Sequence, residues 1–145
     1  MDKLPHYPQG EVFELTLDGG APENHPLVMV QDEPRAGEWK HSGPTIQGTP
    51  TQRFRWVAIG HRPTFADVRI MLKTCGKIPE GQWREAVART FAPDGQHPRG
   101  IADASWIDPR GLPFFPFVDA YGGGSRVREA YGDFVVSWLW LIKVV

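Results

Sequence analysis

The chain has 145 residues with 16 basic and 17 acidic side chains, which gives a formal net charge of −1. This length is typical of a single domain, so we expect one hydrophobic core over residues 1–145. A net charge near zero excludes a strong overall field that would attract nucleic acid or an anionic membrane. The longest apolar run, residues 134–145, contains Ser137 and Lys143 and is too short to cross a bilayer.

Cysteine content and the N-terminal sequence predict a location inside the cell. Cys75 is the only cysteine, which excludes an internal disulfide and is consistent with a reducing compartment. Residues 1–10 lack the apolar segment of a secretory signal. We therefore expect a cytoplasmic protein that does not enter a membrane.

Alternating apolar and polar residues predict strands in the first part of the chain. Glu11–Leu17 alternates in this way, and Leu27–Val30 is a short apolar run of the kind found in strands. A further short strand fits Glu38–His41, and Arg53–Ile59 alternates again. These segments predict a sheet with one face turned to the core.

The clearest helix signal covers residues 65–75. Thr64 is a suitable N-cap residue, and Asp67 stands where a capping box requires an acceptor. Gly76 is a typical residue at which a helix ends. Apolar residues at helical spacing predict one buried stripe made of Phe65, Val68, Met71, Leu72 and Cys75.

A second helix is predicted over residues 79–92. Pro79 suits the first turn of a helix. The pairs Glu80–Arg84 and Glu85–Arg89 are spaced for ion pairs along a solvated face. The apolar residues expected to face the core are Trp83, Ala86, Val87 and Phe91.

Residues 92–128 are rich in proline and glycine, and we expect a long loop there. Trp106–Ile107 and Phe114–Val118 have the composition of short strands, and Pro116 restricts the second to the edge of a sheet. Phe134–Val145 is apolar at nearly every position, which predicts a central strand covered on both faces.

Together these elements predict an α+β fold. We expect a mostly antiparallel sheet of about five or six strands, with both helices packed on one face. Residues 134–145 would form its central strand.

Arginines beside aromatic residues make nucleic-acid or phosphate binding one candidate function. Arg53, Arg55 and Arg62 lie close to Phe54 and Trp56 in the sequence, a composition found in single-strand binding surfaces. In a strand, however, Arg53 and Arg55 would point away from the face that carries the two rings. This geometry argues against a nucleic-acid platform.

Residues 122–128 contain the ingredients of an anion-binding loop. Gly123 and Gly124 supply flexible backbone N–H groups, and Arg126 and Arg128 supply cations. The segment lacks the spacing of a nucleotide-binding loop, and a glycine-rich turn accounts for it equally well. A basic face would have to combine Arg53, Arg55, Arg62, Gly123, Gly124, Arg126 and Arg128.

A catalytic site within residues 92–128 is a further alternative. His97 could act with Asp94 or Asp103 as an acid–base pair, since a carboxylate can orient an imidazole. No nucleophile is marked beside them, because Ser105 and Ser125 lack the context of a nucleophile elbow. The histidines are scattered along the chain, so we expect no metal site, and no motif indicates a cofactor.

No motif in the sequence outweighs its structural explanation, so the leading hypothesis is a non-catalytic protein-interaction or accessory module. Its partner would be another protein or a second copy of this chain, with surplus aromatic side chains at a homodimer interface. The alternatives are the enzyme, the basic face and a glycan-binding surface made from exposed Trp39 or Trp106. Buried indoles would exclude the last of these.

Overall fold

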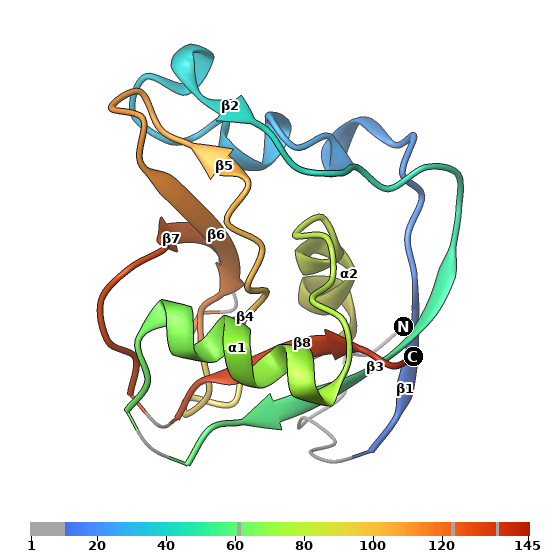
Figure 1. Ribbon diagram of the computed structural model, residues 1–145. Helices are drawn as coiled ribbons and strands as arrows, with labels where there is room; N and C mark the ends of the chain where they lie inside the picture. The colour runs from blue at the N-terminus through green and yellow to red at the C-terminus, as the bar shows by residue number, and fades with distance from the viewer. Residues whose placement is uncertain (1–10, 61, 123, 136) are drawn as a thin grey trace.

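The computed structural model describes residues 11–60, 62–122, 124–135 and 137–145. Within them lie two α-helices and one eight-stranded sheet (Figure 1), which confirms the predicted α+β class. The strands are β1 (Phe13–Thr16), β2 (Lys40–His41), β3 (Thr51–Ala58), β4 (Arg99–Gly100), β5 (Trp106–Ile107), β6 (Pro113–Val118), β7 (Ser125–Glu129) and β8 (Leu139–Lys143). The helices are α1 (Phe65–Cys75) and α2 (Trp83–Thr90), with 3-10 turns η1 (Pro22–Asn24), η2 (Val28–Val30) and η3 (Ala36–Glu38).

The sheet follows the order β1-β3-β8-β4-β6-β5-β2, and β7 pairs with β6 beside this path. Of the strand pairs described, only β4 with β8 is parallel, so the sheet is mostly antiparallel as predicted. It has eight strands instead of five or six, because residues 92–128 contain β4 and most of β7 in addition to the two short strands predicted there, β5 and β6.

β8 is the central strand, as predicted, with β3 on one side and β4 on the other. Leu139 and Leu141 pack into a cluster with α2, whereas Trp140 and Ile142 pack into a cluster with α1. The two helices therefore cover opposite faces of β8, and Figure 1 shows α1 in front of it. The prediction of both helices on one face is wrong, because a strand that is apolar on both faces needs a cover on each.

α1 has the predicted bounds and the predicted capping box. The Thr64 hydroxyl accepts the Asp67 N–H at 3.1 Å, and the Asp67 carboxylate accepts the Thr64 N–H at 3.4 Å. Cys75, predicted on the buried stripe, is exposed, and Met71 is 37% exposed. Helical spacing fixes the direction of a side chain, but only a neighbouring element decides whether that side chain is covered.

α2 begins at Trp83, not at Pro79 as predicted. The backbone of Lys77 pairs with Lys143 at the end of β8, which ties the chain before α2 to the sheet. A turn follows, in which the Trp83 N–H donates to the Glu80 carbonyl at 3.2 Å. The pairing with β8 thus takes precedence over the helix-initiating preference of the proline.

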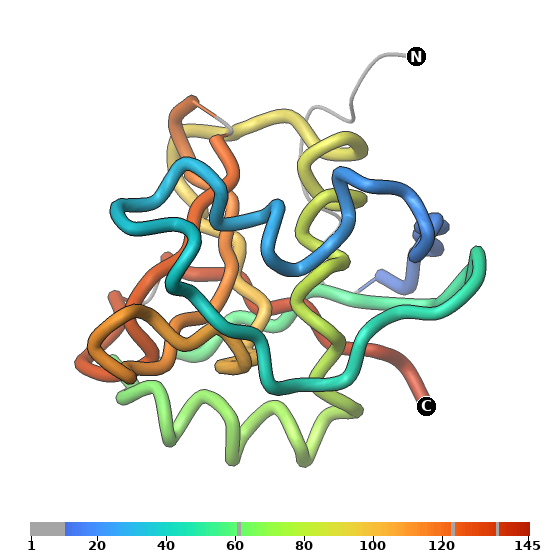
Figure 2. The backbone as a smooth tube through the Cα atoms, turned by 90° about the horizontal axis from the view of Figure 1, so that it is seen from above, coloured from blue at the N-terminus to red at the C-terminus, as the bar shows by residue number. Residues whose placement is uncertain are grey.

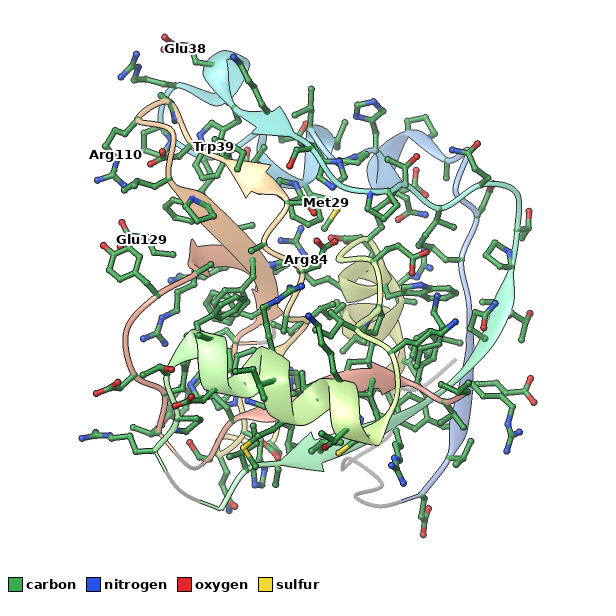
Figure 3. All side chains as sticks on the ribbon, viewed as in Figure 1. Met29, Glu38, Trp39, Arg84, Arg110 and Glu129 are labelled. Carbon is green, nitrogen blue, oxygen red and sulfur yellow. The ribbon has the colours of Figure 1, made fainter. Side chains whose placement is uncertain are left out.

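Arg84 of α2 lies in the interior and not on a solvated face (Figure 3). Its side chain is 3% exposed and donates to the carbonyls of Arg126 at 2.7 Å and Met29 at 3.4 Å. It forms an ion pair with Glu85 at 2.7 Å, whereas its predicted partner Glu80 pairs elsewhere. These bonds offset the cost of burying the guanidinium, and they join α2 to η2 and β7.

β6 lies inside the sheet, between β7 on one side and β4 and β5 on the other, although it contains Pro116. The Pro116 carbonyl accepts the Ile101 N–H at 3.1 Å, so the N–H that proline lacks would face residues 101–105. These residues run between β4 and β5 outside any strand, and no ladder acceptor is lost there. The predicted edge position is wrong for this reason.

Two other predicted strands are absent or shortened. Leu27–Val30 is not a strand, because Val28–Val30 forms a 3-10 turn. β8 covers only part of residues 134–145, since the Trp138 N–H donates to the Val135 carbonyl at 3.3 Å in a turn. Apolar composition indicates burial but not extended backbone. Val136 lies outside the described residues.

Gly100 of β4 provides a test of this packing. A Cβ atom there would lie 2.6 Å from the Trp140 ring and 3.2 Å from the Trp138 ring, and these residues are 1% and 4% exposed. We expect Gly100→Ala to lower the free energy of unfolding by about 1–3 kcal/mol in urea denaturation. Gly37→Ala is the control, since nothing lies within 4 Å of its Cβ position. Equal losses in both variants would contradict the close packing.

Candidate functional site

The predicted acid–base pair is present but is held by its own loop. His97 Nδ1 lies 2.5 Å from an Asp94 carboxylate oxygen, and the other oxygen accepts the backbone N–H groups of Gln96 and His97 at 2.9 and 2.8 Å. Neither Asp94 nor His97 lines any of the four cavities described. Asp103 lines a cavity that does not contain them. The bonds between Asp94 and His97 stabilise a turn. Asp103 lies elsewhere and does not belong to this pair.

Hydrogen bonds set the ionisation of Asp94. Burial alone would raise its pKa, but the His97 side chain and the N–H groups of His97 and Gln96 together hold the pKa below its ordinary value. The folded state therefore favours the carboxylate.

The predicted basic face is divided between distant strands. Arg53 and Arg55 of β3 point away from the buried Phe54 and Trp56, as the alternation predicts, and Arg55 donates to the Cys75 carbonyl at 3.0 Å. Three strands lie between β3 and β7. Arg126 and Arg128 belong to β7. Arg62 is exposed in the segment before α1, and Gly124 is exposed before β7. Gly123 lies outside the described residues.

The aromatic residues proposed for glycan binding are buried. Trp39 is 6% exposed and Trp106 is 0% exposed. Their indole N–H groups donate to the carbonyls of Pro34 at 3.1 Å and Pro26 at 2.8 Å. The premise of the glycan hypothesis is therefore wrong, because each ring anchors a loop to the core.

β7 is an edge strand, and its outer backbone groups have no strand partner in the part of the chain that the structure describes. Among the described residues it pairs with β6 alone, and Val127 stands opposite Pro116. Because the Pro116 carbonyl points away from β7 to Ile101, this opposed pair exchanges no hydrogen bonds. The N–H and C=O groups of Val127 therefore point outward, and alternation gives the same direction at Ser125 and Glu129.

Exposed arginines and tyrosines border this edge. Arg126 and Arg128 share one face of β7, and both are exposed. Tyr121 in the turn before β7 is 82% exposed, and Tyr131 just after it is 57% exposed. Figure 2 shows the turn between β6 and β7 at the periphery of the molecule. We call the outer edge of Ser125–Glu129, with these two tyrosines, the β7 surface.

Aromatic rings hold one of the arginines in place. The Arg128 Cζ atom lies 4.5 Å from the centroid of the Phe134 ring and 5.3 Å from that of the Trp138 ring. Both rings are buried, so the guanidinium covers the edge of the core while remaining exposed itself. This contact fixes a positive charge beside the free strand edge.

Two acidic side chains near the β7 surface, Glu129 and Asp119, already have partners within the protein. Arg110 bonds Glu129 at 3.0 Å and Asp108 at 2.7 Å, and Figure 3 shows Arg110 and Glu129 on the same side of the molecule. The Tyr131 hydroxyl and then Arg110 hold the pKa of Glu129 below its ordinary value. The Asp119 carboxylate accepts the backbone N–H of Tyr121 at 2.7 Å. Arg126 and Arg128 take part in none of the six ion pairs among the described residues.

Comparison with known proteins gives no relative: the sequence matches no protein-family model, and no curated protein or solved structure matches it significantly.

Neither α1 nor α2 is long and apolar enough to cross a membrane, within the part of the chain described. In that same part, no three His, Cys, Asp or Glu side chains gather as a metal site would require.

Sequence reasoning named Arg126 and Arg128 only as candidates for an anion-binding loop or a basic face. It missed Tyr121, Tyr131 and the free edge between them. The alternation of Ser125–Glu129 was a signal for a strand, whereas its edge position follows from pairings that involve residues far away in the chain.

The Asp94 pair generates a pH-dependent prediction. A carboxyl group whose pKa is lower in the folded than in the unfolded state stabilises the fold above its unfolded pKa, and this stability is lost as the pH falls through the folded pKa. We expect Asp94→Ala to lower the free energy of unfolding by about 1–3 kcal/mol at pH 7. The difference from the wild type should shrink as the pH falls below the ordinary aspartate value of 3.8. Urea denaturation over a pH series measures it, with Asp32→Ala as the exposed control. A difference that stays constant down to acid pH would refute this role.

Proposed function

We propose that this protein is a non-catalytic interaction module that binds an extended, acidic segment of a partner protein along the β7 surface. The observation that carries the proposal is the outward-facing backbone of Ser125, Val127 and Glu129, which has no strand partner among the described residues. Strand addition to a free sheet edge is a recurrent mode of peptide recognition, in which main-chain hydrogen bonds provide affinity.

The charge of the partner follows from the side chains beside the edge. Arg126 and Arg128 lie on one face, two residues apart, so an added strand would place alternate side chains opposite them. Glutamate or aspartate at those positions would form charge-assisted bonds with two guanidinium groups that take part in no ion pair among the described residues. An acidic segment with alternating polarity is therefore the complementary ligand.

The same charges disfavour self-association through this edge. If two copies paired antiparallel about Val127, Arg126 of one copy would stand opposite Arg128 of the other, on one face. Like charges directly opposite each other destabilise a strand pair. A heterologous acidic partner is thus favoured over the homodimer that remained open from the sequence.

The exposed tyrosines extend the contact beyond hydrogen bonds. Tyr121 and Tyr131 stand at the two ends of β7, and tyrosine and arginine are both enriched at protein interfaces. A partner strand that spans β7 would contact the Tyr121 ring at one end and the Tyr131 ring at the other. These contacts would bury apolar surface on both sides of the two arginines.

The test uses a labelled ten-residue peptide of alternating glutamate and threonine, measured by fluorescence anisotropy. We expect binding that weakens with salt, and we expect Arg126→Glu with Arg128→Glu to weaken it at least about tenfold. Arg126→Glu alone tests the surface without disturbing the Arg128 contact with the core rings. Arg53→Glu with Arg62→Glu is the control, because it makes the same change in charge at exposed residues elsewhere.

Backbone methylation of the peptide separates strand addition from simple charge attraction. If glutamates face the two arginines, the threonines lie opposite Val127 and their N–H groups point at β7. Methylating the threonine nitrogens should abolish binding, whereas methylating the glutamate nitrogens should leave it nearly unchanged. Equal effects of both methylations, equal losses in both double variants, or a stable dimer in light scattering would overturn the proposal.

A further inference from the structure

A cavity of about 350 Å³ lies between α1, the segment before α2, the residues between β4 and β5, and the end of β8. Its volume is within the range of small-molecule sites and is large enough for a compound of amino-acid size. Five polar or charged side chains converge on it: Arg69, Glu80, Asp103, Ser105 and Lys143. None of them belongs to the β7 surface, so the inference below is independent of the proposed function.

Bonds to the surrounding backbone and to one another hold these side chains in place. An Arg69 Nη atom donates to the Ala102 carbonyl, and Lys143 Nζ lies 2.9 Å from Glu80. The Asp103 carboxylate accepts the Gly81 N–H at 2.8 Å through one oxygen and the Ser105 hydroxyl through the other. The positions of the charged groups are therefore set before any ligand arrives.

The cavity contains binding capacity that the protein does not use. Arg69 takes part in none of the six ion pairs among the described residues, and its bond to Ala102 occupies one of its five N–H donors. Lys143 and Glu80 each keep capacity for further bonds beyond their mutual contact. Asp103, by contrast, is bonded through both oxygens.

The charges in the cavity restrict the ligand. Two cationic and two anionic side chains give a formal balance of zero, so an inorganic dianion or a simple cation would meet repulsion as well as attraction. A zwitterion can place its carboxylate on the planar fork of Arg69 and its ammonium group against Glu80. Pro44, Ile78 and Pro79 supply an apolar wall for the rest of the molecule.

We propose that this cavity binds a free α-amino acid with an apolar side chain. Arg69 holds the carboxylate, Glu80 accepts the ammonium group through the bonding capacity that its contact with Lys143 leaves, and Lys143 adds a second positive charge near the carboxylate. Asp103 and Ser105 act as positioning residues, because their mutual bond and the bond to Gly81 fix the wall of the cavity.

Three matched probes test the proposal by calorimetry and by amide shifts in nitrogen-15 spectra of the full chain. L-leucine carries both charged groups, isocaproate lacks the ammonium group, and isopentylamine lacks the carboxylate. We expect L-leucine to bind at least about tenfold more tightly than either analogue. The shifts should concentrate at α1, residues 78–80 and residues 102–105.

Two variants assign the roles of the charged residues. Arg69→Gln should weaken L-leucine and isocaproate alike, and Arg69→Lys should restore part of the loss, which checks that the cavity is still formed. Glu80→Gln should weaken L-leucine but not isocaproate, and Arg53→Gln, at an exposed arginine of β3, should change neither. No saturable binding of L-leucine up to about 50 mM, or equal binding of the three probes, would overturn the proposal.

Discussion

The burial of β8 on both faces is the constraint from which the rest of the architecture follows. On one face, Trp138 and Trp140 stack at 5.2 Å and 18°, and Phe115 and Phe134 pack against them. On the other face, Leu139 and Leu141 pack against α2. Each apolar face of β8 therefore needs its own helix as a cover. The aromatic rings fill the space between the sheet and α1.

This core decides how the remaining segments are placed. β4 can lie beside β8 because Gly100 has no side chain where the two indoles approach it. β6 then pairs with β4, and β7 is added outside β6. Arg128 rests on Phe134 and Trp138 of the same cluster, so the charge at the strand edge is positioned by the core itself.

Two sets of arginines have contrasting surroundings. Arg84 and Arg99 are 3% and 1% exposed and bond to backbone carbonyls, which makes them internal connectors of loops and strands. Burial lowers the pKa of Arg99 to about 10, which still leaves it charged at neutral pH. The exposed arginines of β7 and the partly exposed Arg69 take part in no ion pair among the described residues, and both proposals place them against a ligand.

Local sequence determined the features that depend on short-range periodicity: α1 with its capping box, the alternation in β3 that buries Phe54 and Trp56, and the central place of β8. These rest on backbone geometry and on side-chain direction, which neighbours in the sequence fix. Only the tertiary structure decided which side chains are covered. It exposed Cys75, buried Arg84 and left β7 at an edge, because coverage and strand pairing depend on segments that are distant in the chain.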